Sequence, residues 1–418
     1  KYEEKINRLK QDERNPFIYR RKPLGAVCFP NDYSLGMANL GYAQLINAFA
    51  DTVGFERFFS LRNYPQKAGY SFENDRELSQ FPLIAFSIPY ERDLINAIKM
   101  MENGGVLRND KYFKIAGGFS VTLNPEPFTP FFDILFLGEA DTFWSEFLNV
   151  ISEYDIFTSK HKILTKLNNL RGVYVPLFNT KSPEIRKTGN TADLKTIPQI
   201  ISPDAHFGEA HLVDICRGCR FKCNFCASGY SRKKPLYRDL ISVFSHDKNA
   251  DKLGLIGSIV SDHPDFDRML SIASMENLEL GISSLRLDEL SPISLQAMKN
   301  SGIRSLTIAP EAGSDRLRKI CGKNISNEQI VDTAERISSQ GFKSLKLYFM
   351  IGLPTENDDD LTALSELCRD ISHKTNLRIQ ASIAVFTPKA RTPFQFSRFI
   401  SKEEFKEKID LIKRVFAK

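Results

Sequence analysis

Short apolar runs that each lead into an amphipathic stretch organise the first part of the chain. Residues 36–49 and 91–101 repeat their apolar positions with helical spacing, and each of them follows such a run. Strands that feed helices in this way favour a parallel, doubly wound, Rossmann-like sheet. The four runs, each followed at once by a proline or a glycine, are residues 25–29, 83–88, 113–116 and 133–137.

Doubly wound sheets bind ligands beyond the carboxyl ends of their strands. In this chain the loops at 30–36, 117–126 and 138–141 follow predicted strands. We therefore expect these three loops to hold whatever the first domain binds.

From residue 209 the alternation of strands and helices resumes, now with six strands. Candidate helices between them include residues 264–276, 289–300, 326–340 and 357–372. Six β/α units predict a partial, TIM-like (β/α)6 barrel, in which the chemistry lies at the carboxyl ends of the strands. The candidate strands are residues 211–216, 253–257, 278–284, 303–308, 344–350 and 378–384.

These patterns divide an α/β chain of 418 residues, longer than a typical single domain, into five segments. The last segment contains the capping box Ser401-Lys-Glu-Glu404, which predicts the start of a helix. The segments are an N-terminal helical extension (1–24), a Rossmann-like domain (25–154), an irregular connector (155–208), the partial barrel (209–395) and a C-terminal helix (396–418).

The composition is that of a globular protein in a reducing compartment. No apolar run approaches the roughly 20 residues of a membrane span, and the charged start of the chain as given is not a signal peptide. The net charge of +6 comes with 26% charged residues of both signs, so no nucleic-acid partner is predicted. Seven cysteines, four of them crowded together, suit a cytoplasmic protein with a metal site better than a disulfide framework.

The crowded cysteines carry the strongest chemical signal. Cys219, Cys223 and Cys226 have the spacing C-x3-C-x2-C, which puts three thiolates on one loop. A closed [4Fe–4S] cluster needs a thiolate at each of its four irons, so three leave one iron open to a ligand that is not protein. Phe225, just before the last cysteine, could pack against such a ligand.

Cys216 supports a competing interpretation. With it the spacing becomes C-x2-C-x3-C-x2-C, and four cysteines could bind structural zinc or a closed cluster. Zinc ribbons, however, usually separate their two cysteine pairs by a dozen or more residues. Cys216 also ends the apolar run that starts at His211, which places it in the strand before the loop.

Polar or glycine-rich groups follow several predicted barrel strands. Each group alone is weak evidence for a binding site, because glycine at these positions is also common in turns and an arginine could form a surface ion pair of little energy. Their shared position at one end of the barrel is what favours a binding site. The groups contain Gly257 and Ser258, Arg286, Glu311, and the segment Met350-Ile351-Gly352.

With these residues, positions 211–390 resemble the radical S-adenosylmethionine (SAM) superfamily. The likeness extends from the cysteine loop to Ala309-Pro-Glu-Ala-Gly-Ser314 and Leu347-Tyr-Phe-Met-Ile-Gly-Leu-Pro-Thr-Glu356. The first domain is similar to the cobalamin-binding-like (flavodoxin-type) domain of one branch of that superfamily. Its matching pieces are Phe29 to Gly41, Ala116-Gly-Gly118 and Asn124-Pro-Glu-Pro127.

The resemblance implies a role for each residue of the site. Cys219, Cys223 and Cys226 would ligate the [4Fe–4S] cluster, whose open iron SAM chelates. Gly257 and Ser258 would lie near the amino group of SAM, although the chain lacks the acid that many relatives carry there. The remaining SAM contacts would be Phe225, Met350, Ile351 and Gly352 to the adenine, and Arg286 and Glu311 to the carboxylate and to the ribose or ammonium group.

For the first domain, the resemblance implies a cobalamin site or a sheet kept as a scaffold. Many cobalamin domains supply an axial histidine from an Asp-x-His-x-x-Gly loop, but this chain has no histidine before His161. Cobalamin, if bound, would therefore be held without that ligand. Its expected contacts are Gly117, Gly118, Asn124 and Glu126.

The function implied by the resemblance is reductive cleavage of SAM to a 5′-deoxyadenosyl radical. An electron donor such as flavodoxin or ferredoxin would reduce the cluster, and the substrate is not identified by any motif. We expect a cobalamin-dependent methyltransferase that acts on an unactivated carbon. The alternatives are a radical SAM oxidoreductase or rearrangement enzyme with a cobalamin-free scaffold domain, and a non-catalytic iron–sulfur or zinc protein.

Overall fold

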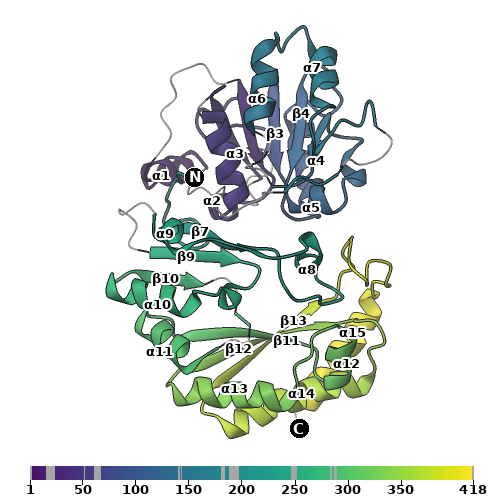
Figure 1. Ribbon diagram of the computed structural model, residues 1–418. Coiled ribbons are helices and arrows are strands. Elements are labelled where there is room, and N and C mark those ends of the chain that lie inside the picture. Colours follow the sequence, from purple (N-terminus) through teal and green to yellow (C-terminus); the bar gives the residue numbers. More distant parts are fainter. Residues whose placement is uncertain are drawn as a thin grey trace. The chain divides into compact units, whose positions relative to one another are not determined.

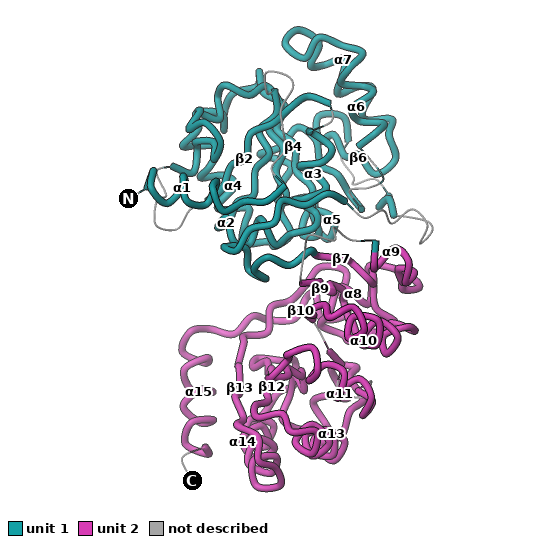
Figure 2. Tube along the Cα trace, turned by 90° about the vertical axis from the view of Figure 1, so that its left-hand side faces the viewer, with its two compact units in different colours: residues 1–211, 245–250 teal, residues 212–244, 251–418 magenta. Residues whose placement is uncertain are grey.

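The computed structural model describes residues 2–15, 24–50, 52–60, 67–139, 142, 144–179, 184–187, 197–245, 252–282, 285–286 and 290–416. The chain forms two compact units, coloured separately in Figure 2. Unit 1 comprises residues 1–211 and 245–250, and unit 2 comprises residues 212–244 and 251–418. None of the helices in the described ranges has the length and apolar character needed to cross a membrane.

Unit 1 is a doubly wound sheet with strand order β2-β1-β3-β4-β5-β6. The first five strands are parallel, and β6 pairs antiparallel with β5 at the edge. The four strands predicted from apolar runs are all present. The strands are β1 (Gly25–Phe29), β2 (Phe55–Phe59), β3 (Leu83–Ser87), β4 (Phe113–Gly117), β5 (Ile134–Phe136) and β6 (Val173–Tyr174).

Helices cover both faces of this sheet (Figure 1), so alternate residues of each strand enter two separate cores. Val27 of β1 joins the core that includes Phe49 of α3, whereas Cys28 joins the core that includes Met100 of α4. The helices of unit 1 are α1 (Tyr2–Gln11), α2 (Tyr33–Met37), α3 (Leu40–Ala50), α4 (Asp93–Asn103), α5 (Phe119–Leu123), α6 (Trp144–Glu153) and α7 (Lys160–Leu167).

The stretch that we expected to be a connector belongs largely to unit 1. Helix α7 buries Ile163, Leu164 and Leu167 in one core of the sheet, and β6 adds a strand to its edge. The short apolar segments of this stretch are too brief to stand out among its polar residues. Residues 180–183 and 188–196 of the expected connector lie outside the described residues.

Unit 2 contains the six strands expected of the partial barrel, arranged in two sheets. One has the order β10-β9-β7-β8, with the short β8 antiparallel to β7, and the other is β11-β12-β13. The strands are β7 (Ala210–Arg217), β8 (Leu236–Tyr237), β9 (Lys252–Gly257), β10 (Glu279–Ile282), β11 (Ser305–Glu311), β12 (Ser344–Ile351) and β13 (Arg378–Val385).

The helices of unit 2 start at strong local signals. Capping boxes formed by Ser326 with Gln329 and by Asn357 with Asp360 begin α13 and α14. Helix α15 packs against α14, where the hydroxyl of Ser365 donates to the carbonyl of Ile412 at 3.4 Å. The helices are α8 (Ser228–Ser231), α9 (Leu240–Phe244), α10 (Phe266–Met275), α11 (Pro292–Asn300), α12 (Asp315–Ile320), α13 (Asn327–Ser339), α14 (Asp358–Lys374) and α15 (Lys402–Phe416).

Candidate active site

The cysteine loop follows β7 and brings three thiols close to one another. Cys219 is buried, and Cys223 and Cys226 are half-buried. Burial, together with Cys226 and Cys223 nearby, raises the pKa of the Cys219 thiol to about 11. Three deprotonated thiols here would therefore need concentrated positive charge, which the irons of a cluster would supply. Among the described residues, no three His, Cys, Asp or Glu side chains surround a position for a single metal ion.

Cys216 lies in β7 rather than on the loop. Its thiol donates to the carbonyl of Gly218 at 3.4 Å, and the backbone amides of Ser258 and Ile259 lower its pKa against the larger opposing effect of burial. A Cβ on Gly257 would lie 3.3 Å from the Cβ of Cys216, so this glycine allows β9 to pass close to β7. Gly257 and Ser258 thus adjoin Cys216 at the carboxyl ends of these two strands.

A second loop, between α12 and α13, holds the cysteine loop in place. The backbone amide of Asn224 donates to the carbonyl of Cys321 at 2.8 Å, and its side-chain amide donates to the carbonyl of Ile320 at 2.8 Å. A Cβ on Gly322 would lie 3.0 Å from the carbonyl oxygen of Lys222. The close approach of these two backbones therefore depends on glycine, which here has a positive φ of 71°.

Arg286 also contacts the cysteine loop. The carbon of its guanidinium group is 3.5 Å from the centroid of the Phe221 ring, and its backbone amide donates to the hydroxyl of Ser261 at 2.8 Å. Its positive charge lowers the pKa of Cys223, although burial raises that pKa more. The structure thus places the predicted carboxylate-binding arginine beside the predicted cluster ligands.

Glu311 and Lys323 form an ion pair at the same loop. Their charged groups are 3.0 Å apart, and both side chains are largely buried. Glu311 has a positive φ of 71°, and the register of β11 with β12 is interrupted between Ile308 and Glu311. A non-glycine residue in this conformation is typical of functional sites. Lys323 is the strongest of the charges that lower the pKa of Cys223.

The residues predicted to contact adenine do not share one environment. Phe225 and Met350 both pack against a small apolar cluster that includes Cys321 and Phe386. Ile351, by contrast, has a fully buried side chain in the main core of unit 2. A ligand could therefore contact Ile351 only through its backbone.

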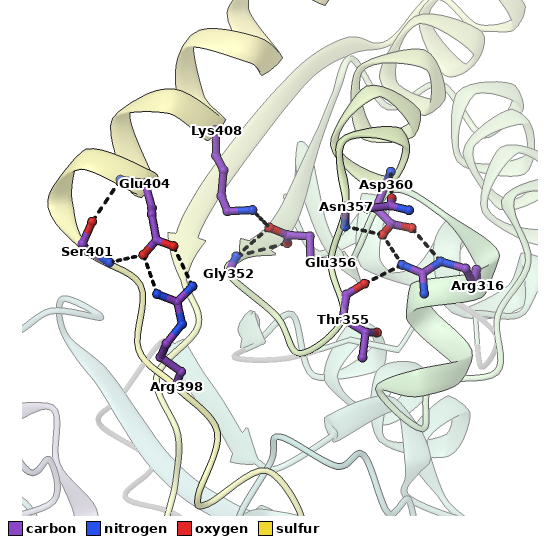
Figure 3. A network of polar contacts seen from close by, with 10 residues as sticks. All are labelled: Arg316, Gly352, Thr355, Glu356, Asn357, Asp360, Arg398, Ser401, Glu404 and Lys408. Carbon is purple, nitrogen blue, oxygen red and sulfur yellow. Dashed lines mark hydrogen bonds and ion pairs between the residues drawn. The ribbon is translucent and has the colours of Figure 1, made fainter.

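Gly352 is held by an acid from its own loop (Figure 3). Its backbone amide donates to the two carboxylate oxygens of Glu356, at 2.9 and 3.1 Å. Glu356 in turn pairs with Lys408 of α15 at 2.8 Å, and its side chain is only 2% exposed. The positive φ of 82° and the nearness of Ile400 explain why glycine stands here. This amide therefore shapes the loop and is already engaged within the protein.

Unit 1 has a cavity of about 310 Å³ at the carboxyl ends of β1 and β3. These neighbouring strands form the point where the strand order reverses, which is where doubly wound sheets bind ligands. Inside the cavity the side-chain amide of Asn31 donates to Asp93 at 2.9 Å, and burial raises the pKa of Asp93. The lining residues are Phe29, Asn31, Leu35, Ala38, Asn39, Pro89, Tyr90, Asp93, His206 and Phe207.

The four residues expected to contact cobalamin do not line this cavity. Gly117 ends β4, and Gly118 has a φ of 129° and would collide with the carbonyl oxygen of Ile88 if it carried a Cβ. Asn124 and Glu126 are exposed on the loop beyond. Of the three loops expected to hold a ligand, residues 30–36 contribute lining residues, whereas 117–126 and the described part of 138–141, residues 138 and 139, do not; residues 140 and 141 lie outside the described residues.

Sequence reasoning also missed three residues that the structure brings to these sites. Asn224 and Lys323 lie beside the cysteine ligands, and His206 reaches the cavity of unit 1 from the expected connector. Asn224, between the second and third cysteines, could have been suspected from its position. Nothing in the local sequence marks Lys323 or His206.

Family comparisons match both units. Residues 44–176 match the model described as "Radical SAM proteins, N-terminal", and residues 213–368 match "Radical SAM superfamily". The chain is 28% identical over 402 residues, 94% of its own length and 83% of the relative's, to the uncharacterized protein MJ0966 of Methanocaldococcus jannaschii.

Two solved structures share the fold at low sequence identity. One is the radical SAM methyltransferase TsrM of Kitasatospora setae, with cobalamin and a [4Fe–4S] cluster bound. Its TM-score is 0.63 at 12% identity, over 90% of this chain and 77% of TsrM. The other is the cobalamin-dependent SAM radical enzyme OxsB, with a TM-score of 0.59 at 13% identity, over 94% of this chain and 56% of OxsB.

A partial β/α barrel with three clustered thiols at the carboxyl end of its first strand defines an iron–sulfur enzyme that acts through SAM. The chain belongs to the radical SAM superfamily, and its fold is similar to that of the cobalamin-dependent enzymes TsrM and OxsB. The expected fold class and the assignment as an enzyme are confirmed. The superfamily implies a [4Fe–4S] cluster and SAM as cofactors.

Proposed function

We propose that the enzyme transfers a methyl group to an unactivated carbon of its substrate, with cobalamin bound by unit 1. The observation that carries the radical chemistry is the convergence of three thiols, Arg286 and the Glu311–Lys323 pair around the cysteine loop of unit 2. The observation that supports a second cofactor is the cavity at the strand reversal of unit 1. When bound, the cluster and SAM supply a radical that removes hydrogen from carbon, and cobalamin supplies a methyl carrier.

Each group of the site has a task that its surroundings suit. Cys219, Cys223 and Cys226 would hold the cluster. Arg286 would bind the carboxylate of SAM, because the ring of Phe221 fixes its guanidinium plane.

Glu311 would accept hydrogen bonds from the ribose hydroxyls of SAM. Lys323, which also donates to the carbonyl of Ala309, holds that carboxylate in place at 3.0 Å. Phe225 and Met350 would offer an apolar surface to the adenine.

The cavity of unit 1 supports a second ligand. Its volume of about 310 Å³ suits one part of a large cofactor. Asn31, Tyr90 and His206 offer polar groups there, and Phe207 offers an apolar wall. The remainder of the cofactor would lie over the carboxyl edge of the sheet.

One observation favours the alternative in which unit 1 is only a scaffold. Gly118 is explained by its contact with the carbonyl of Ile88, which also accepts a hydrogen bond from the hydroxyl of Ser120 at 2.6 Å. Gly118 thus has a packing role that needs no ligand. A radical SAM oxidoreductase without methyl transfer is then the second candidate.

Anaerobic reconstitution of the cluster tests the radical chemistry that both candidate functions share. Reduced, cluster-loaded protein should convert SAM to 5′-deoxyadenosine. Cys219→Ala removes one of the three thiol ligands of the cluster and should abolish this conversion. Cys368→Ala is the matched control, because Cys368 is buried in the core of unit 2 away from the loop. The control should keep its activity, and formation of product by Cys219→Ala would refute the site.

Cobalamin binding is measured separately. Protein mixed with hydroxocobalamin should keep its visible absorbance through desalting, and active enzyme should then form S-adenosylhomocysteine. Cleavage of SAM without retained colour would support the scaffold alternative instead.

A further inference from the structure

One face of the sheet β11-β12-β13 carries polar side chains. Along β12, Leu345, Leu347 and Phe349 are buried in the main core of unit 2, against α13 and α14 (Figure 1). The alternate residues of the strand therefore point to the opposite face. We call that face the inner face; on β12 it carries Ser344, Lys346, Tyr348 and Met350.

The parallel register extends this face across all three strands. Lys346 pairs with Thr307 of β11 and with Gln380 of β13, and Ser344 pairs with Arg378. Register partners in a parallel sheet share a face, so Arg378 and Lys346 lie on the inner face of neighbouring strands. Tyr348, which is 42% exposed, lies between Lys346 and the site at the carboxyl end.

The inner face is positively charged. The ammonium of Lys346 lies 4.8 Å from the centroid of the Tyr348 ring, and within the described parts of the chain no acid pairs with Lys346 or Arg378. Glu311, the acid on this face, is already paired with Lys323. Two cations therefore remain without negative charge beside them.

The two cations are placed to share one anion. Neighbouring strands are about 4.8 Å apart and two residues span about 6.6 Å, so the Cα atoms of Lys346 and Arg378 are roughly 8 Å apart. Both side chains are long enough to converge over that distance. Met350, at the carboxyl end, is four residues or about 13 Å from Lys346 along the strand.

We propose that the inner face binds the substrate through an anionic group, a carboxylate or a phosphate, held between Lys346 and Arg378. Tyr348 lies against the body of the substrate, which extends from this group toward the carboxyl end of the barrel. This assignment rests on the proposed function and names the class of substrate: an extended, anionic molecule whose reacting carbon is more than 10 Å from its charge, on the order of four strand residues.

Pyridoxal phosphate is a suitable probe, because its aldehyde forms an imine with a lysine while its phosphate occupies a neighbouring anion site. The cluster-loaded protein is labelled, the imine is reduced with borohydride, and the modified lysines are located by peptide mass spectrometry. Lys343 is the matched control, since it is exposed and precedes the same strand. We expect Lys346 to be labelled in preference to Lys343.

Competing anions identify the chemistry of the site. Tripolyphosphate or citrate should lower labelling of Lys346 about tenfold, the effect of one charge-assisted hydrogen bond, and leave Lys343 unchanged. The stronger competitor distinguishes a phosphate from a carboxylate site. Arg378→Gln should abolish this protection, and Arg378→Lys should retain it, which separates loss of charge from misfolding.

Equal labelling of the two lysines, or protection that survives in Arg378→Gln, would overturn the assignment. Cleavage of SAM is assayed in the same preparation of unmodified enzyme. Absence of 5′-deoxyadenosine with the labelling pattern intact would refute the proposed function and leave the anion site standing.

Discussion

Arg318 offers a sharp test of how the fold builds the site. This residue of α12 has no exposed surface, and its guanidinium group donates to the carbonyls of Ile325 and Ala312 at 2.6 Å each. It also contacts Asp315 and Asn327. Arg318 therefore connects the two ends of the segment that carries the Cys321–Lys323 loop beside the cysteines.

Replacing Arg318 with methionine keeps the unbranched apolar part of the side chain but removes every donor. The carbonyls of Ile325 and Ala312 stay buried without these partners, at about 1–3 kcal/mol each. Burying the guanidinium itself is unfavourable, so its removal returns part of that energy. Asp315, the acid that loses its partner, is 48% exposed and adds little. The two carbonyls dominate, and we expect Arg318→Met to cost about 3 kcal/mol.

Hydrogen exchange localises the effect. Amides of residues 312–327 should exchange at least about a hundredfold faster in Arg318→Met, which corresponds to about 3 kcal/mol. The only tryptophan of the chain, Trp144, lies in unit 1, so its fluorescence follows that unit during urea unfolding. The fluorescence transition should be unchanged.

The matched control is Lys319→Met on the same helix, where the side chain is exposed. It should alter stability by no more than about 0.5 kcal/mol. Unchanged exchange at 312–327 in Arg318→Met, or equal effects of the two variants, would refute the view that the buried guanidinium organises this loop.

Three further predictions concern unit 2. Lys323→Met leaves the largely buried carboxylate of Glu311 without its ion pair, so we expect weaker SAM binding by calorimetry, whereas unaltered affinity would remove Glu311 from the site. Gly313→Ala places a Cβ 2.1 Å from the backbone nitrogen of Leu364 and should destabilise the protein by about 1–3 kcal/mol in urea unfolding. Burial would raise the pKa of Asp360, but hydrogen bonds to its carboxylate outweigh burial and lower that pKa. As pH falls, the Asp360 carboxylate therefore binds a proton in the unfolded chain before it does so in the folded chain. The ionised carboxylate stabilises the fold at pH values above its ordinary pKa near 4, and this stabilisation is lost as pH falls further. Urea titrations should show a smaller loss of stability with acid in Asp360→Asn.

Most strands of both units could be predicted because their core-facing residues are apolar. Strand β2 of unit 1 could not be predicted, since its sequence, Phe55-Glu-Arg-Phe-Phe59, places two charges in its middle. Both are buried and paired by distant segments: Arg57 with Glu13 at 2.7 Å, and Glu56 with Arg76 at 2.9 Å. In a sequence, a charged residue predicts an exposed position, and only the tertiary fold reveals a buried partner.

The same limit applies to the sites. The cysteine ligands are marked by their spacing, because one short loop must present all of them to a cluster. Lys323 is brought to that loop by the turn after α12, and His206 reaches the cavity of unit 1 from a segment that the sequence leaves irregular. The tertiary fold brings such residues to the site, so no local sequence pattern marks them.

The glycines of unit 1 show why the fold alone does not single out one strand end as a ligand site. Gly117 and Gly118 end a parallel strand, which is where ligands bind such sheets, yet the cavity lies at the ends of β1 and β3. A sheet has several strand ends but only one reversal of strand order, and that reversal is set by which strands pair. Strand β2 joins the sheet beside β1 and creates the reversal. Because this strand is hidden by its buried charges, the sequence alone identified the fold of unit 1 and included the loop at 30–36 among three ligand loops, but it could not single that loop out.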